Sequence, residues 1–467
     1  MASKTSISKC NHSSLCFSSS PNATVAGFRR PTQKQRVAAA KPKNDASENT
    51  NNLNVNFLNE DDRAFPAPLV LPGDDLSEDP EYPAQSFQEW LDDEDRNPVK
   101  PKQKKLFVCS VPEVFDGVEF LKDWKPEINL MATKEQCQPP NALLIQDYLK
   151  AFYHGLPIGM TPTYNMRYTT WTKTKKTSGK QKIPKYVGLD IGGGEVVRIR
   201  IRERPGGDYP GQLNLNDLLD AAIAILPKSA YALLLLVHFD LYEDDEDSFV
   251  CGRAYGGSRV AVVSTARYNP LLDDSYDHQV ERVHPWPASH CEEYVNTYTK
   301  EELEEQPPSK RPRTIGKGSR MSAVAQNGPL REAVSAYGAL RPMKPGKELS
   351  AERVNDLWLD RVCRTASHEL GHCFGIDHCV YYACMMQGTA SLAEDVRQPP
   401  YLCPVDLAKV LHATGASAAG RYKALLKYCD LPQNQKSYLF QPFAAWIKSR
   451  VAEVEEVSGP ECSTAEN

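Results

Sequence analysis

The chain of 467 residues has no apolar segment long enough to cross a membrane and no excess of positive charge. Its longest aliphatic run, residues 232–237, is far shorter than the roughly 20 residues that a transmembrane helix needs. The formal net charge of -5 at pH 7 argues against a nucleic-acid-binding protein, which would present a basic face. With 41% hydrophobic residues, the composition is that of a globular protein with a sizeable core. We therefore expect neither a membrane nor a nucleic-acid partner.

An apolar leader of the secretory type is also missing from the N-terminal region. The cysteine count of 13 is odd, and the spacing is not that of a disulfide-rich scaffold. These features predict a cytoplasmic and/or nuclear protein, in whose reducing compartment clustered cysteines serve as metal ligands more often than as disulfides. The alternative is an organelle, because residues 1–44 contain basic but no acidic side chains, as transit peptides do.

Composition divides the chain into four regions. Residues 1–62 are rich in Ser, Asn, Lys and Ala with little apolar periodicity, which predicts a disordered N-terminal tail. Residues 63–103 carry many Pro, Asp and Glu residues, so we expect an extended arm there. The main folded domain is predicted over 104–435, with an exposed low-complexity insertion at 300–330, followed by a C-terminal extension over 436–467.

Short apolar or alternating segments and amphipathic segments follow one another within the main domain. The former predict strands over 106–109, 196–202, 231–239, 249–251 and 259–265. The latter predict helices over 141–153 and 213–226. Strands interleaved with helices are typical of a mixed α/β architecture.

A further helix is predicted over 351–374, where apolar side chains recur at steps of three and four. It contains His368 and His372, whose spacing places both imidazoles on one side of the helix, where they can reach one zinc ion at about 2.0–2.1 Å. Glu369 is rotated from His368 by roughly 100°. Its carboxylate would then lie beside the metal, where it can take a proton from bound water. The segment is a candidate catalytic zinc site.

The motif continues beyond the helix. Gly375 can adopt a positive φ and let the chain turn back, which would bring His378 to the same metal. Three histidines leave the fourth position open for water and substrate, as a catalytic zinc requires. The full string H-E-x-x-H-x-x-G-x-x-H is the metzincin signature, and Met386 follows at the place of the expected Met-turn.

A second group of potential ligands overlaps the first. Cys379 follows the third histidine directly, and Cys384 and Cys403 come next. Free cysteines are often simply buried, so three scattered core residues are one interpretation. The other interpretation, which the crowding around one turn favours, is a second, structural zinc ion.

The whole pattern resembles that of the archaemetzincins, in which the metzincin string precedes C-x4-C-x-M and a distal C-x-x-C pair. Cys379, Cys384 and Met386 match the first element, and Cys403 opens the second. Asp406 stands where the family has its last cysteine. Aspartate can bind zinc through oxygen at about 2.0–2.2 Å, so Asp406 is the candidate fourth ligand. His412 and Cys373 are the alternatives, and a site without zinc also stays open.

The resemblance implies a zinc metallopeptidase of the α/β (α+β) class. Its fold would be a metzincin-like mixed twisted sheet with an active-site helix and two long helices above the cleft. A small C-terminal subdomain would carry the Met-turn and the structural zinc. Residues 260–264 would form the strand that lines the cleft, where an extended substrate could add by backbone pairing.

The implied activity is hydrolysis of peptide or protein substrates, with Glu369 as general base and short-peptide aminopeptidase action as one option. The alternative is a catalytically silent, zinc-stabilised binding or scaffold protein. The intact Glu369 argues against that alternative, because a purely structural zinc site has no use for a carboxylate there. Substrate identity and oligomeric state are not encoded in any motif.

Overall fold

The computed structural model describes residues 10, 12–42, 58, 61–126, 137–161, 166–171, 183–305, 327–340 and 349–458. The chain forms two compact units. We call them the helical unit (Met1–Asp93, Val280–Glu348 and Ile376–Asn467) and the sheet unit (Glu94–Gln279 and Leu349–Gly375). None of the described helices is long and apolar enough to cross a membrane.

The centre of the sheet unit is a five-stranded sheet in the order β10-β11-β8-β1-β3. All neighbours in it are parallel except the edge strand β10, which is antiparallel to β11. Every residue of β8 is buried, because β1 and β11 flank it and helices cover both faces. The strand bounds are β1 (Lys105–Cys109), β3 (Ile158–Met160), β8 (Ala230–Val237), β10 (Gly252–Tyr255) and β11 (Val260–Ser264).

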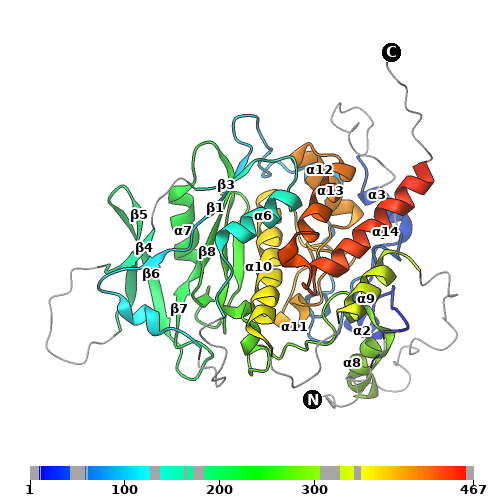
Figure 1. Cartoon of the computed structure of the whole chain (residues 1–467), viewed down its shortest axis with the longest axis horizontal. Coiled ribbons are helices and arrows are strands. Elements are labelled where there is room, and N and C mark those ends of the chain that lie inside the picture. Colours follow the sequence, from blue (N-terminus) through cyan, green and yellow to red (C-terminus); the bar gives the residue numbers. More distant parts are fainter. Residues whose placement is uncertain are drawn as a thin grey trace. The chain divides into compact units, whose positions relative to one another are not determined.

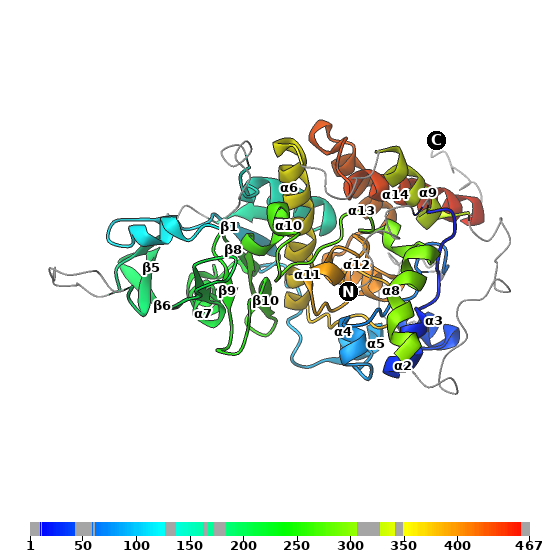
Figure 2. The same ribbon diagram turned by 90° about the horizontal axis from the view of Figure 1, so that it is seen from below.

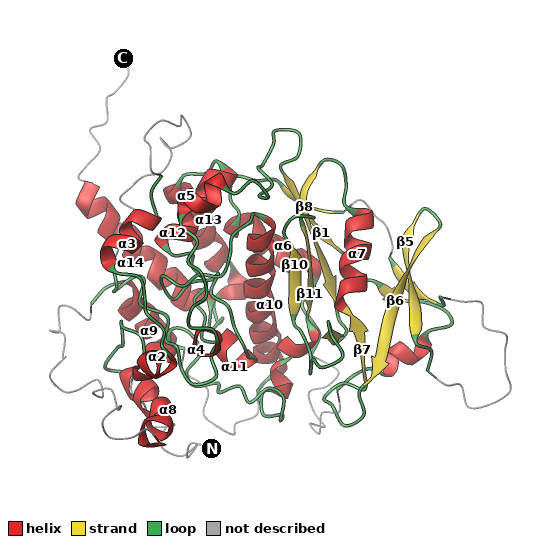
Figure 3. Ribbon diagram, turned by 180° about the vertical axis from the view of Figure 1, so that it is seen from behind, coloured by secondary structure: helices red, strands yellow, loops and turns green. Residues whose placement is uncertain are grey.

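Helices α6 (Ala142–Phe152) and α10 (Ala351–Cys373) cover one face of this sheet, and α7 (Leu215–Ile225) covers the other (Figure 3). Beyond α7 lies a six-stranded mixed sheet in the order β2-β4-β5-β6-β7-β9. One large apolar core joins α7 to both sheets. The strands are β2 (Glu113–Val114), β4 (Arg167–Thr169), β5 (Tyr186–Gly192), β6 (Glu195–Glu203), β7 (Gly211–Asn214) and β9 (Leu241–Tyr242).

Most elements predicted for this unit are confirmed, and with them the mixed α/β class. Helices α6, α7 and α10 match the predicted segments, and so do β1, β6, β8 and β11. The strand predicted over 249–251 is displaced: residues 252–255 form β10 instead. The displacement arises because β10 pairs in register with β11, from Gly252 opposite Val263 to Tyr255 opposite Val260.

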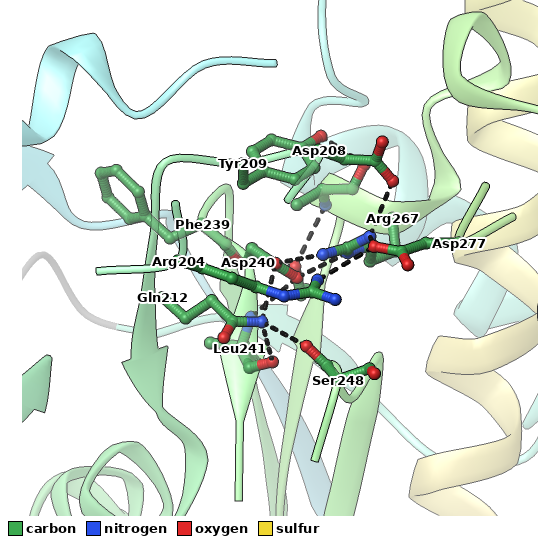
Figure 4. A network of polar contacts seen from close by, with 12 residues as sticks. Arg204, Asp208, Tyr209, Gln212, Phe239, Asp240, Leu241, Ser248, Arg267 and Asp277 are labelled. Carbon is green, nitrogen blue, oxygen red and sulfur yellow. Dashed lines mark hydrogen bonds and ion pairs between the residues drawn. The ribbon is translucent and has the colours of Figure 1, made fainter. Parts of the chain in front are cut away.

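A buried ionic network fixes the connections that follow β8 and β11 (Figure 4). The Arg267 guanidinium is fully buried and binds the Asp240 carboxylate through two hydrogen bonds, of 2.8 Å from Nε and 2.6 Å from Nη2. Its Nη1 atom also lies 3.0 Å from Asp208 Oδ2 and 3.2 Å from Asp277 Oδ2. Gln212 completes the set by donating to Asp240 at 2.8 Å. A buried charge needs such partners to offset its loss of hydration.

The helical unit is built from short helices that come from three separate stretches of the chain. Figures 1 and 2 show α2 beside α8, although these two helices are far apart in the sequence. The bounds are α2 (Pro21–Ala26), α3 (Gln33–Ala39), α4 (Asp75–Glu78), α5 (Phe87–Asp92), α8 (Glu292–Glu305), α9 (Pro329–Ala339), α11 (Leu392–Asp395), α12 (Pro404–Thr414), α13 (Ala418–Cys429) and α14 (Phe440–Ser458).

The expected C-terminal extension is part of the core of this unit. Helix α14 packs against α9 and α13. Trp446 of α14 is fully buried, donates from Nε1 to the carbonyl of Ala64 at 3.0 Å, and stacks on Tyr401 with ring centroids 4.5 Å apart. The predicted C-terminal subdomain is therefore completed by residues from the N-terminal region and by α8 and α9. Composition does not reveal this, because the partners are hundreds of positions apart.

The N-terminal region also differs from the expected disordered tail and extended arm. Within 1–62, the described residues include α2 and α3, and Thr32 caps α3 with a reciprocal capping box. Single apolar side chains such as Phe17 and Phe28 are buried in contacts with distant segments, which local periodicity does not show. In the arm, α4 and α5 form. Of the predicted insertion at 300–330, residues 306–326 lie outside the described residues.

Four polar contacts anchor α10 to the rest of the sheet unit. Trp358 Nε1 donates to the carbonyl of Thr265 at 2.7 Å, and Arg361 binds Asp273 through two hydrogen bonds of 2.6 and 2.8 Å. Near the end of the helix, hydroxyl groups of the sheet unit bind its carbonyls. They are Tyr153 to Ser367 at 2.5 Å and Tyr231 to Cys373 at 3.1 Å.

Replacing Asp273 by Ala should destabilise the protein by about 3–5 kcal/mol, because the buried Arg361 guanidinium loses its main counter-charge. The double variant Arg361→Met/Asp273→Leu should recover much of this loss, since both charges are then gone. Denaturant unfolding measures both changes. Asp147→Ala, which breaks an exposed pair with Lys150 on α6, is the control and should cost less than about 1 kcal/mol. Equal losses at the two sites would contradict the anchoring role.

Candidate metal centres

The last turns of α10 bring two imidazoles together. The Nε2 atoms of His368 and His372 are 3.0 Å apart, and the rings are almost perpendicular at 83°. Two nitrogens bound tetrahedrally to one zinc ion at about 2.0–2.1 Å would lie roughly 3.3 Å apart. Both side chains are half-buried. The pair therefore fits a single metal ion with little movement.

Glu369 lies between the two histidines in sequence and is buried. Burial raises the pKa of its carboxyl group from 4.5 to about 8, and the Arg253 guanidinium of β10 opposes this rise. A carboxyl group in this range can both accept and release a proton near neutral pH, as a general base requires. The sequence did not predict the effect of Arg253 on the pKa of Glu369, because this effect depends on how the edge strand β10 packs against α10.

The helix ends at a turn that requires glycine. Gly375 has φ of +75°, and its amide donates to the carbonyl of His372 at 2.9 Å. A Cβ atom added at Gly375 would lie 2.9 Å from Cγ of Arg96. Both the left-handed backbone and the close side chain thus exclude larger residues.

His378 follows three residues later and belongs to the helical unit. Three residues span at most about 11 Å, so the chain itself keeps His378 near the end of α10. Its ring is half-buried and lies 5.5 Å from that of Tyr82. Gly388 packs closely against it, since an added Cβ there would be 2.8 Å from Nδ1 of His378.

The three cysteines and Asp406 form one cluster within the helical unit. The four ligand atoms lie within 4.8 Å of one another, and every residue of the cluster is buried. Sγ of Cys379 is 3.6 Å from Sγ of Cys403. The thiols of Cys384 and Cys403 lie 3.3 and 3.4 Å from Oδ2 of Asp406. This is the ligand number and donor type of a structural zinc site.

The electrostatics of the cluster fit a cation. Burial raises the pKa of Asp406 to about 7, and the negative charge of Cys379 adds to the rise. Lys409, itself buried, opposes it with an ion pair of 2.9 Å to Oδ1. Cysteines that bind zinc do so as thiolates, and a divalent ion would offset negative charge that the single ammonium group of Lys409 cannot balance alone.

Neither alternative fourth ligand is in this cluster. Cys373 is the last residue of α10 and belongs to the sheet unit. His412 packs edge-on against the rings of Phe87 and Trp90, with centroids 5.6 Å away in both cases. Asp406 is the residue that the fold of the helical unit places beside the three thiols.

Met386 belongs to the turn that shapes the cluster. Its side chain is fully buried, and its carbonyl accepts a hydrogen bond of 2.7 Å from the amide of Cys379. The amide of Gln387 in turn donates to the carbonyl of Cys384 at 3.0 Å. These bonds hold the first two cysteines of the cluster on either side of one tight loop.

Comparison with known proteins shows similarity to the archaemetzincins. Residues 347–410 match the model of Peptidase family M54. Archaemetzincin-2 of Pongo abelii is 23% identical over 383 residues, which are 81% of this chain and 78% of that protein. Archaemetzincin-1 of Homo sapiens is 39% identical over 69 residues, 15% of this chain and 14% of that protein.

Among solved structures, the archaemetzincin of Methanopyrus kandleri is 17% identical and covers 66% of this chain and 95% of that chain, with a TM-score of 0.28. A superposition as loose as this does not bear on the assignment.

The mixed α/β fold, the paired histidines of α10 and the family match define the class of protein: the chain is a zinc metallopeptidase. The sequence similarity is to the archaemetzincins: residues 347–410 match the model of peptidase family M54, and most of the chain aligns with archaemetzincin-2 at low identity.

Replacing Gly375 by Ala should destabilise the protein by roughly 1–2 kcal/mol, because alanine disfavours the left-handed backbone and its Cβ would contact Arg96. The variant should also bind zinc more weakly, since the turn sets the direction of the chain towards His378. Denaturant unfolding and a zinc titration measure the two effects. Gly257→Ala is the control, because an added Cβ there meets nothing within 4 Å. Indistinguishable results for the two variants would show that the turn is dispensable.

Proposed function

We propose that the protein hydrolyses peptide bonds with a catalytic zinc ion held by His368, His372 and His378. The observation that carries this proposal is the 3.0 Å approach of the two Nε2 atoms on α10, with the buried Glu369 beside them. The turn at Gly375 supports the third ligand, because it reverses the chain three residues before His378. Three imidazoles leave one position of a tetrahedral ion for a reactant.

In this proposal, the zinc ion supplies Lewis acidity towards the scissile carbonyl and the attacking water. Glu369 takes a proton from that water and delivers it to the leaving amine. Its burial suits both steps, because a carboxyl group with a pKa of about 8 holds a proton more readily than an exposed one. Arg253 limits the rise and so keeps part of the population ionised near neutral pH.

The strand expected to bind substrate requires a correction. Residues 260–264 form β11, but β11 pairs with β10 on one side and β8 on the other, so its backbone is not open to a peptide. Within the described residues, β10 is the strand at this edge of the sheet. The turn after it approaches the end of α10, since an added Cβ at Gly256 would lie 2.7 Å from the carbonyl oxygen of His372.

We therefore propose β10, and not β11, as the strand that binds an extended substrate by backbone pairing. Arg253 on the same strand, paired with Glu243, also influences the charge of Glu369. Aminopeptidase action on short peptides is compatible with this arrangement, and so is internal cleavage, because an edge strand can pair with either kind of substrate.

Replacing Glu369 by Ala should leave the zinc content unchanged and lower turnover by about 10²–10⁴-fold, the usual contribution of a general base. The assay is digestion of a peptide library by purified, zinc-loaded protein, read by mass spectrometry. Glu352→Ala, at an exposed position in the first turn of α10, is the control and should retain full activity. The cut positions of the wild type distinguish terminal from internal cleavage.

Retained cleavage by Glu369→Ala would rule out this base. Silence of the wild type with zinc bound would favour the binding or scaffold function.

We also propose that Cys379, Cys384, Cys403 and Asp406 bind a second, structural zinc ion. Support comes from their mutual approach within 4.8 Å and from the complete burial of the four groups. Lys409 offsets part of the negative charge and orients Asp406 through its other oxygen. Such an ion would tie the loop at Met386 to the start of α12, where Cys403 is the N-cap residue.

Replacing Cys384 by Ser should remove one equivalent of zinc and lower the melting temperature. Asp406→Cys should keep that equivalent and release it more slowly to a chelator, because thiolate is the preferred zinc ligand of structural sites. Elemental analysis and chelator kinetics measure these effects. Cys429→Ser, at a buried position of α13 outside the cluster, is the control and should keep all its zinc. Unchanged zinc content in Cys384→Ser would contradict the second site.

A further inference from the structure

Another group of ligand-type side chains lies in the helical unit, apart from the residues assigned so far. Cys10, His12 and His284 each bring a ligand atom to within 4.8 Å of the other two. The two imidazole rings meet edge to face with centroids 5.2 Å apart. His12 is 9% exposed and His284 only 1%, so water is largely excluded from both imidazole rings.

Both histidines present a buried nitrogen that no described residue satisfies. The Nε2 atoms of His12 and His284 are buried, and neither has a hydrogen-bond partner among the described residues. An unsatisfied buried polar atom costs about 1–3 kcal/mol. A metal ion between the two rings would accept both lone pairs and remove this cost.

The orientation of His284 is that of a metal ligand. Its Nδ1 atom lies 3.0 Å from Oε2 of Glu281, and its backbone amide donates to the same oxygen at 2.7 Å. An ionised carboxylate can only accept, so this contact places the proton on Nδ1 and the lone pair on Nε2. The ring of Tyr294 stacks on His284 at 4.4 Å and holds the imidazole plane. Histidines that bind metals are commonly oriented by such a carboxylate.

Cys291 offers a fourth ligand. It lies outside the group of three whose ligand atoms are within 4.8 Å of one another, but Cys10 packs against the apolar cluster that contains Cys291. Cys291 is buried and directly precedes α8, so its side chain stands at the N-terminus of that helix. Amides at a helix N-terminus stabilise a thiolate, which is the form of cysteine that binds metals.

The backbone holds the two contributing segments side by side. The amide of Cys16 donates to the carbonyl of His290 at 2.8 Å, and the amide of Glu292 donates to that of Ser14 at 3.0 Å. Arg331 of α9 adds a hydrogen bond of 2.9 Å to the carbonyl of His12. The ligands therefore come from two segments that are already paired, so binding requires little rearrangement.

We propose that Cys10, His12, His284 and Cys291 bind a further structural zinc ion, which cross-links the N-terminal segment to the segment that leads into α8. Two sulfur and two imidazole ligands are typical of structural zinc. The site stands on its own residues and does not depend on the proposed hydrolysis.

The first experiment counts zinc in the full-length protein. Cys10→Ser/His284→Ala should bind one equivalent of zinc fewer than the wild type. Cys137→Ser/His154→Ala, with both positions in the sheet unit and outside every ligand cluster of the described residues, should bind as much as the wild type. Equal zinc content in the two double variants would overturn the proposal. Glu281→Gln should keep the zinc but release it to a chelator about 10-fold faster, since an amide orients His284 less firmly.

A second experiment uses the wild type alone, so it does not depend on the folding of a variant. Cys10 and Cys291 should resist alkylation in the zinc-loaded protein and become reactive after chelation, with Cys137 as an internal reference that reacts in both states. Equal reactivity of Cys10 with and without zinc would overturn the proposal. A disulfide between Cys10 and Cys291 in zinc-loaded protein, found by mass spectrometry without reduction, would do the same.

Discussion

The chemistry of this protein depends on how firmly the last turns of α10 are held. Two imidazoles four residues apart can share an ion only while the helix keeps its geometry and its rotation about its own axis. Four buried polar contacts provide this, and two of them reach the carbonyls of Ser367 and Cys373, which flank the ligand pair. A functional site tolerates errors of only about 0.5 Å, so these contacts matter as much as the ligands themselves.

The same helix also determines the protonation state of Glu369, the proposed general base. Packing along the sheet buries Glu369, and the edge strand brings the charge of Arg253 to bear on it. Burial and the positive charge shift the pKa of the carboxyl group in opposite directions, and burial has the larger effect. Substrate binding at β10 would then place the peptide on the strand that carries Arg253, which links recognition to proton transfer.

The two units differ in how they are stabilised. The sheet unit has one large apolar core that joins α7 to both of its sheets. In the helical unit, several small apolar clusters lie among short helices from three stretches of chain. Both proposed structural zinc sites lie in this second unit. A metal ion that cross-links separate segments would add to the stability that the buried aromatic side chains of this unit provide.

The exchange of the family's last cysteine for Asp406 is consistent with this view of the helical unit. An oxygen ligand is a weaker partner for zinc than a thiolate, but Lys409 and the complete burial of Asp406 hold its carboxylate in place. The sequence showed the exchange and left His412 and Cys373 as alternatives. Only the fold shows that the first turn of α12 brings the carboxylate of Asp406 beside the thiols of Cys384 and Cys403.

The sequence by itself determined the features that arise from short spacings along the chain. The spacing of His368 and His372, the turn at Gly375 and four strands of the sheet unit (β1, β6, β8 and β11) follow from local patterns, so they were predictable. Tertiary structure decided what depends on distant segments: the edge position of β10, the role of α14 in the core, and the meeting of Cys10 with His284. No local pattern records these contacts, because the free energy that favours them comes from burial of surfaces that are far apart until the chain folds.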